Sequence, residues 1–227
     1  NPRPEIRRPR RRHVRSARHG RARSPRARHA ASGPPGIPAA FVELTLQAKF
    51  NDLDSVIKLA EENFHEIAAI ILEPVAGNMG MIPPVHGFLR GLRDLCDREG
   101  ILLIFDEVMS GFRVDYGGAQ NIFGIVPDIS IFGKIIGGGL PVGAYGGRQD
   151  IMLQVAPAGP VYQAGTLSGN PLAVAAGLST LEILRKKNPY PELGQKTSWL
   201  SGEFQSAAES AGVPLQTQAM GGMFGFF

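Results

Sequence analysis

The sequence contains one cysteine, one tryptophan and no long uninterrupted apolar run. A single cysteine, Cys96, excludes a disulfide framework and a zinc module built on several cysteines. The longest apolar runs, near Ile67–Leu72 and Ile101–Phe105, are far shorter than the roughly 18–20 residues that cross a bilayer, so we expect no membrane partner. What the chain does have is 43% hydrophobic residues in 227, which is enough for a substantial core.

Lysine is absent from residues 1–40, which contain 12 arginines and one acid, Glu5, for a net charge of +11. The remaining residues carry −7, so the formal charge of +4 describes neither part. Residues 1–38 are rich in Arg, Pro, Ala and Gly, and we predict that they are disordered. They lack Phe, Tyr and Trp for base stacking, so we do not expect a nucleic-acid partner. An organelle transit peptide and a mistranslated GC-rich stretch are the competing interpretations.

From Asn51 onward, continuous apolar runs alternate with amphipathic segments. This pattern predicts an α/β domain with a mostly parallel sheet and helices on both faces, and we assign residues 39–227 to it. The expected helices cover residues 51–64, 87–98, 170–185 and 192–211. The expected strands cover residues 67–72, 101–105, 128–132, 141–145, 215–218 and 223–227.

Three ionisable residues stand at the ends of predicted strands: Glu73, Asp106 and Lys134. In parallel sheets, ligands bind beyond the carboxyl ends of the strands, so this placement indicates a site. Each residue also has a simpler interpretation. Asp106 could cap a helix or form an ion pair, Lys134 could extend its amine to the surface, and Glu73 could cap its strand end beside Pro74.

Taken together, Asp106 and Lys134 fit a pyridoxal phosphate site. A lysine amine in a desolvated cleft can form an imine with an aldehyde, and arginine cannot. An acid can keep the pyridine nitrogen protonated, so that the ring accepts electrons. Val108 could cover one face of the ring. Residues 165–170 (GTLSGN) offer hydroxyls, glycines and a following helix N-terminus for a phosphate.

Four longer stretches carry a resemblance to a known family. They are Glu73–Gly80 (EPVAGNMG), Phe105–Arg113 (FDEVMSGFR), Phe132–Gly147 (FGKIIGGGLPVGAYGG) and Ala156–Pro171 (APAGPVYQAGTLSGNP). They resemble the glutamate-1-semialdehyde 2,1-aminomutases, which are class III, fold-type I pyridoxal-phosphate enzymes. The resemblance covers about residues 48–227. The short motifs Asp-Glu-Val and Gly-Lys are shared across class III aminotransferases, whereas the long glycine-rich strings are more particular to the aminomutases.

The resemblance implies a role for each candidate residue. Lys134 matches the Schiff-base lysine, Asp106 the partner of the pyridine nitrogen, and Val108 the residue packed on the ring. Asn78 matches a residue near the phenolic oxygen of the cofactor, and Thr166 a phosphate ligand contributed across a dimer interface. The implied cofactor is pyridoxal 5'-phosphate, starting as pyridoxamine 5'-phosphate, in a homodimer.

The implied reaction converts glutamate 1-semialdehyde, a small-molecule substrate, to 5-aminolevulinate for tetrapyrrole biosynthesis. The alternatives are another class III aminotransferase, which would need an external amino acceptor, and an inactive truncated product. The implied location is cytoplasmic, with the plastid stroma as the alternative. Arg113 could bind a substrate carboxylate, although an ion pair with a neighbouring acid is the favoured interpretation.

The chain departs from this family at its beginning and its end. It stops at Phe227 on an apolar run, and we interpret it as a fragment that lacks sequence on both sides. The Arg-rich segment stands where the family has an aromatic-His-Gly segment and a Gly-Ser-Gly segment. We therefore favour a frameshifted or misassembled reading before Pro35 over a transit peptide. Resequencing the gene upstream of the Pro35 codon would decide this.

Overall fold

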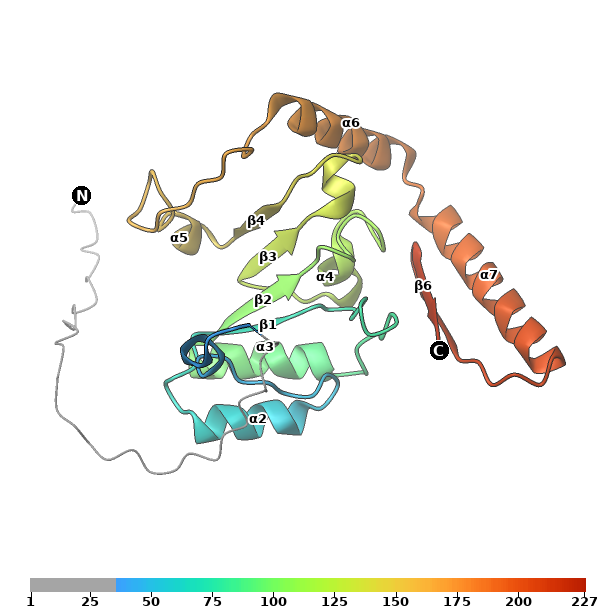
Figure 1. Ribbon diagram of the computed structural model, residues 1–227, viewed down its shortest axis with the longest axis horizontal. Helices are drawn as coiled ribbons and strands as arrows, with labels where there is room; N and C mark the ends of the chain where they lie inside the picture. The colour runs from blue at the N-terminus through green and yellow to red at the C-terminus, as the bar shows by residue number, and fades with distance from the viewer. Residues whose placement is uncertain (1–35) are drawn as a thin grey trace, which may run out of the picture. The chain divides into compact units, whose positions relative to one another are not determined.

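The computed structural model describes residues 36–227, and Figure 1 shows it as a ribbon. The chain divides into two compact units, residues 1–47 and Ala48–Phe227. The described part of the first unit contains one short helix, α1 (Ala39–Val42). Most of the Arg-rich segment, together with the predictions made for it, lies outside the described residues. The remaining paragraphs concern the second unit.

The centre of the second unit is a sheet of four strands in chain order (Figure 1). β1 (Ala69–Leu72), β2 (Leu102–Asp106) and β3 (Ile129–Phe132) run parallel, and β4 (Ala144–Gly147) pairs antiparallel with β3. The predicted α/β domain with a mostly parallel sheet is thereby confirmed. The fourth strand begins three residues later than the prediction of 141–145.

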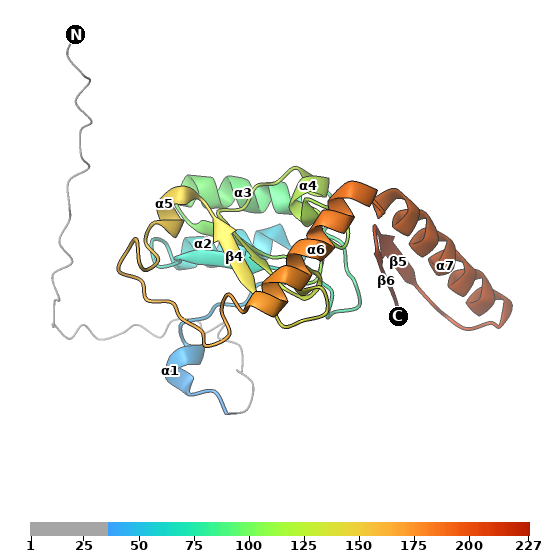
Figure 2. The same ribbon diagram turned by 90° about the horizontal axis from the view of Figure 1, so that it is seen from above.

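Helices connect the strands and lie on both sides of the sheet. Figure 2 shows α3 and α4 on one side and α6 toward the other. The helical elements are α2 (Leu53–Glu62), α3 (Phe88–Glu99), α4 (Gly118–Phe123), the 3₁₀ turn η1 (Lys134–Gly137), α5 (Gln149–Met152) and α6 (Pro171–Lys187). Of these elements, the sequence predicts α2, α3 and α6. It does not predict α4, η1 and α5, because one or two turns are too short to show an apolar period.

The main core lies between the sheet and the pair α2 and α3. Leu103 and Phe105 of β2 are completely buried there, whereas Ile104, between them, faces the other side. The helices contribute Val56 and Ala60 from α2 and Phe88, Leu89, Leu92, Leu95 and Cys96 from α3. The same alternation leaves Ile71 of β1 60% exposed on the opposite face.

Helix ends follow the capping residues in the sequence. Asp52 accepts a hydrogen bond from the Ser55 backbone N–H at 3.0 Å and so caps α2. The Asn170 side chain accepts from the N–H groups of Leu172 and Ala173 at 3.1 and 3.2 Å, and Pro171 occupies the first helical position. The predicted start of α6 is therefore confirmed. Within residues 36–227, the helices are all too short or too polar to span a membrane.

The last part of the unit is α7 (Tyr190–Ser210) followed by a hairpin of β5 (Thr217–Met220) and β6 (Met223–Phe226). The hairpin turn is Gly221–Gly222. The Tyr190 hydroxyl donates to the Phe112 carbonyl at 3.1 Å, which ties α7 to the segment after β2. Burial, together with the nearby Asp115, raises the pKa of Tyr190 to about 12.

Candidate functional site

A cleft of about 460 Å³ opens at the carboxyl ends of β1, β2 and β3. Its lining residues come from the three segments that leave these strands: Glu73, Gly77, Asn78, Asp106, Val108, Met109 and Lys134. Four of the five predicted site residues therefore share one cleft, although the sequence separates them by up to 56 positions. The topology explains this, because parallel strands end at the same edge of a sheet.

Asp106 is the last residue of β2 and is half-buried. It follows the fully buried Phe105, so the alternation of the strand turns it to the face away from α3 and into the cleft. Its Oδ1 accepts a hydrogen bond from the Val108 backbone N–H at 3.0 Å. Across the described part of the chain Asp106 forms no ion pair, so its carboxylate stays available to a ligand in the cleft.

Lys134 begins η1 with a backbone φ of +48°, in the left-handed region that non-glycine residues seldom adopt. Its side chain is exposed and, among residues 36–227, forms no ion pair. The buried Gly133 precedes it, and a Cβ at Gly133 would lie 3.3 Å from Cγ1 of Val108. Val108 therefore packs beside the backbone that carries the amine.

Helix α6 packs against η1, the turn that begins with Lys134. Gly177 of α6 is buried against η1, and a Cβ at this position would overlap the carbonyl oxygen of Ile136. Only glycine allows the helix to approach the turn this closely. Gly177 is not predicted from the sequence, since a glycine within a helical pattern has no local signature of its contact.

Glu73 combines both interpretations that the sequence left open. Its Oε2 accepts from the Gly77 backbone N–H at 2.9 Å, which caps the turn after β1, and the residue also lines the cleft. Gly77 and Met109 also line the cleft, and neither is predicted as a site residue from the sequence. A Cβ at Gly77 would lie 3.1 Å from Cγ of Met109, so the two segments pack closely here.

Thr166 does not line the cleft. It is exposed in the loop between α5 and α6, where the Ser168 N–H donates to the Gly165 carbonyl at 2.9 Å. The predicted phosphate ligand is therefore not brought together with the other four residues within this chain.

Two further residues lie outside the cleft. Cys96 is buried on the apolar face of α3, and burial raises the pKa of its thiol to about 11. The prediction that Arg113 forms an ion pair with a neighbouring acid is wrong for the described residues. Its guanidinium instead donates to the Gly222 carbonyl at 3.3 Å, because the β5–β6 turn lies against this segment.

The opposite edge of the sheet holds a different acid, Asp128, just before β3. Its side chain is 6% exposed and accepts hydrogen bonds from the Leu103 N–H at 2.8 Å, from Arg93 at 2.9 Å and from Arg148 at 2.8 Å. Burial opposes ionisation of Asp128, but these donors outweigh it and hold the pKa of its carboxyl below the usual value. We interpret this group as a structural ion cluster.

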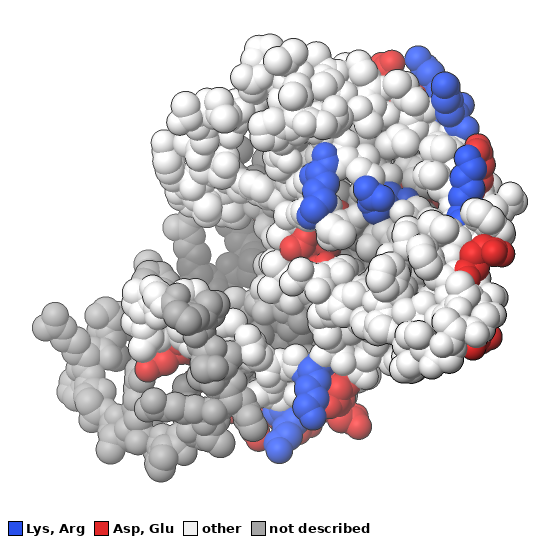
Figure 3. Space-filling view, turned by 45° about the vertical axis from the view of Figure 1, so that its right-hand side comes forward, with Lys and Arg blue, Asp and Glu red and all other residues white. Residues whose placement is uncertain are grey.

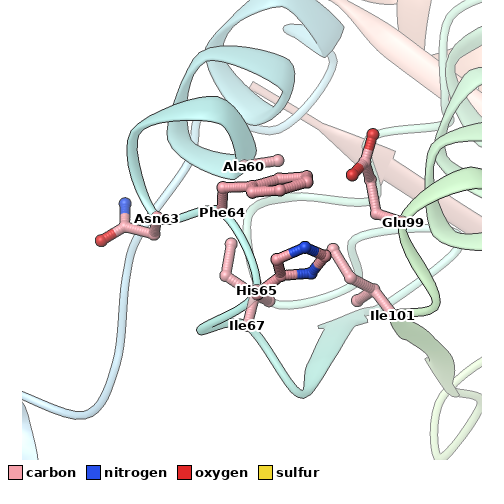
Figure 4. A pocket seen from close by; sticks show the side chains of 7 residues that line it. All are labelled: Ala60, Asn63, Phe64, His65, Ile67, Glu99 and Ile101. Atoms are coloured by element: carbon pink, nitrogen blue, oxygen red, sulfur yellow. The ribbon is translucent and has the colours of Figure 1, made fainter.

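A second pocket is too small for a cofactor. Its volume is about 10 Å³, close to the space for one water molecule. Figure 4 shows it between the end of α2 and the end of α3, where the rings of Phe64 and His65 lie close together at a tilt of 43°. The lining residues are Ala60, Asn63, Phe64, His65, Glu99, Ile67 and Ile101. In the part of the chain that the structure describes, no group of three or more metal-ligating side chains occurs.

On the face of the molecule seen in Figure 3, the charged side chains form a few small groups in which blue and red lie next to each other, with uncharged areas between the groups. The volume of the cleft suits a small aromatic ligand, and the walls offer an amine, a carboxylate, an amide and an apolar valine side chain. This donor set fits pyridoxal phosphate. The fold and the cleft define an α/β protein with a ligand site at the carboxyl edge of its sheet.

The comparison with protein families specifies this class further. Residues 21–227 match the family described as aminotransferase class-III, and the chain belongs to this family. Membership implies pyridoxal phosphate as the cofactor. The match begins at residue 21, which lies inside the Arg-rich segment.

Solved structures agree with this assignment. An omega-transaminase from Sphaerobacter thermophilus is 37% identical with a TM-score of 0.76, over 84% of this chain and 44% of that one. A glutamate-1-semialdehyde-aminomutase from Pseudomonas aeruginosa in complex with PMP is 29% identical with a TM-score of 0.73, over 87% and 45%. A transaminase with PLP bound is 29% identical with a TM-score of 0.79, over 84% and 45%. The chain thus spans less than half the length of these proteins, and its fold is that of fold-type I transferases.

Proposed function

We propose that this chain is the central part of the cofactor-binding domain of a glutamate-1-semialdehyde 2,1-aminomutase. The observation that carries the proposal is the shared cleft of Lys134, Asp106, Val108 and Asn78. The activity would convert glutamate 1-semialdehyde to 5-aminolevulinate by moving an amino group from carbon 2 to carbon 1.

Each of these four residues of the cleft has a separate role in the proposed chemistry. Pyridoxal phosphate, when bound, supplies a carbon that reacts with amines and a ring that accepts electrons. The amine of Lys134 would hold the cofactor and move protons at the substrate carbons. The Asp106 carboxylate would hold a proton at the ring nitrogen. Val108 would cover one ring face, and Asn78 would lie near the phenolic oxygen.

A phosphate ligand from a second copy of the chain is part of the proposal. Thr166 is exposed and outside the cleft of its own chain, as a residue that serves a partner would be. The helix that follows it exposes apolar side chains, with Leu172 71% and Leu178 59% exposed. Burial of these side chains in a homodimer would remove them from water. The form of cofactor at the start of the cycle is proposed to be pyridoxamine 5'-phosphate.

A transaminase is the second candidate, and a specific observation favours it. The omega-transaminase is more similar in sequence than the aminomutase, at 37% against 29%. In favour of the aminomutase are the strings at residues 132–147 and 156–171, which resemble that family in particular. The two candidates share the cofactor chemistry and differ in the fate of the amino group.

An assay of the complete gene product with glutamate 1-semialdehyde as the sole substrate separates the candidates. The aminomutase forms 5-aminolevulinate without any other amine or acceptor, whereas a transaminase requires a second substrate. Turnover that depends on an added amino acceptor would refute the aminomutase.

Cofactor binding is tested on residues 1–227 by the visible absorbance that appears with added pyridoxal phosphate. We expect a visible band in the wild type, none in Lys134→Ala and an unchanged band in Lys196→Ala. Lys196 is the matched control, because it is an exposed lysine of α7 paired with Glu192, away from the cleft. An equal band in both variants would show that Lys134 does not hold the cofactor.

A further inference from the structure

Glu107 is a fully buried carboxylate without a charged partner among the described residues. It accepts three hydrogen bonds. Its Oε2 accepts from the Ser110 hydroxyl at 2.8 Å and from the Ala119 N–H at 2.7 Å, and its Oε1 accepts from the Gln120 N–H at 2.9 Å. A buried charge is expensive unless its lone pairs are occupied, and here donors occupy both oxygens.

The position of Glu107 in the chain relates it to the cleft. It stands between Asp106, which lines the cleft, and Val108, whose N–H donates to Asp106. The alternation of β2 turns the Glu107 side chain to the opposite side from Asp106. Its own N–H donates to the Ile131 carbonyl at 2.9 Å, so its backbone is also tied to β3.

The surroundings of Glu107 leave little room for it to shift. Gly118 has a φ of +73°, and a Cβ there would lie 2.5 Å from Oε2 of Glu107. The segment 107–111 is closed by the Gly111 N–H, which donates to the Glu107 carbonyl at 2.8 Å. The carboxylate thus joins the end of β2, this turn and the first residues of α4 into one rigid group.

We propose that Glu107 is a positioning residue for the cofactor site. Through its three hydrogen bonds it fixes the backbone at Val108, and the Val108 N–H in turn fixes the carboxylate of Asp106 in the cleft. The effect of Glu107 on the cofactor rests on the proposed function, whereas the hydrogen bonds of Glu107 do not depend on it. Glu107, the second acid of the Asp-Glu pair, thus acts on the face of the strand opposite to Asp106.

All three groups that bond to the Glu107 carboxylate are hydrogen-bond donors, so Glu107→Gln is the most informative variant. The amide keeps the size of the side chain but places an NH₂ group against an N–H donor, and one hydrogen bond is lost. Hydrogen exchange of single amides in the 227-residue chain reports the result without cofactor. We expect the Val108 amide to exchange at least about tenfold faster, since one hydrogen bond to a charged group corresponds to about this factor.

Asp128→Asn is the matched control, because Asp128 is also buried and also accepts from a strand amide, that of Leu103. In this variant the Leu103 amide should exchange faster while the Val108 amide keeps its rate relative to the rest of the sheet. Ser110→Ala, which removes one donor and cannot introduce a clash, should produce a smaller acceleration at Val108.

The outcomes separate the proposal from simpler roles. If Glu107→Gln accelerates exchange only at Ala119 and Gln120, Glu107 merely anchors α4 and the proposal is wrong. If it weakens binding of pyridoxal phosphate about tenfold and Asp128→Asn does not, the positioning role extends to the cofactor. A wild-type chain that binds no pyridoxal phosphate would count against the proposed function, while the exchange rates still decide the role of Glu107.

Discussion

The two edges of the sheet treat their acids in opposite ways. At the amino edge of β3, Asp128 is buried and bonded to Arg93, Arg148 and the Leu103 amide. At the carboxyl edge, Asp106 is half-buried, has one backbone donor and, in residues 36–227, forms no ion pair. The first arrangement uses the charge to hold elements together. The second leaves it facing a cleft in which Lys134 is also unpaired.

This difference shows how to separate stability from function in one sheet. A carboxylate whose lone pairs are occupied contributes to folding and has nothing left for a ligand. A carboxylate and an amine that share a cleft without forming ion pairs both remain available to a ligand. Changes at the two edges should therefore have separable effects.

The largest expected effect is that of Asp106→Asn on activity. The amide keeps an oxygen for the Val108 N–H but cannot hold a proton at the ring nitrogen, so we expect turnover of the complete gene product to fall about 10²–10³-fold. The free energy of unfolding should change by less than about 0.5 kcal/mol. A large loss of stability would show that Asp106 is a structural acid like Asp128.

Asp128→Asn should produce the reverse result. It removes the charge between two arginines, of which Arg93 is only 12% exposed, and we expect a loss of about 3 kcal/mol. Urea unfolding followed by circular dichroism measures this loss. The folded variant should bind pyridoxal phosphate with wild-type affinity, and weakened binding would show that the two edges are coupled.

Gly177→Val tests the support of the Lys134 turn from behind. The side chain would push α6 away from Ile136, at about 1–3 kcal/mol of unfolding free energy, and should also weaken cofactor binding because Lys134 begins η1. Gly202→Ala in α7 is the matched control. No atom lies near its added Cβ, and we expect it to stabilise the chain by up to about 1 kcal/mol. Unaltered binding in Gly177→Val would show that α6 does not position the turn.

The smallest effect is a pH dependence. The pKa of Asp128 is lower in the folded chain than in the unfolded chain, so the unfolded state binds protons first as the pH falls. The stabilisation is complete above the unfolded pKa of about 4 and is lost below it, toward the folded pKa. Unfolding free energies measured from pH 6 to pH 3 should fall less in Asp128→Asn than in the wild type. Equal slopes would contradict the ion cluster.

The sequence predicts many of the site residues but not the packing contacts that support them. Asp106 and Lys134 were found because charged groups after buried strands are unusual, and Val108 because it follows Asp106 closely in the chain. The resemblance gave each of them a role and was the only source for Asn78. Gly77, Met109 and Gly177 were not found, because packing between distant segments has no local pattern. Glu107 is adjacent to a predicted residue, yet no local pattern indicates that its side chain turns to the other face and accepts three hydrogen bonds there.

The sequence alone determined the α/β class, the long helices, and the acids and lysine at strand ends. These depend on local periodicity and capping, which a single chain segment already expresses. The tertiary structure decided which acid is structural and which faces the cleft, that β4 runs antiparallel, and that Thr166 lies apart from the other candidates. Those outcomes depend on contacts between segments far apart in the chain, where burial and available donors determine the state of each charge.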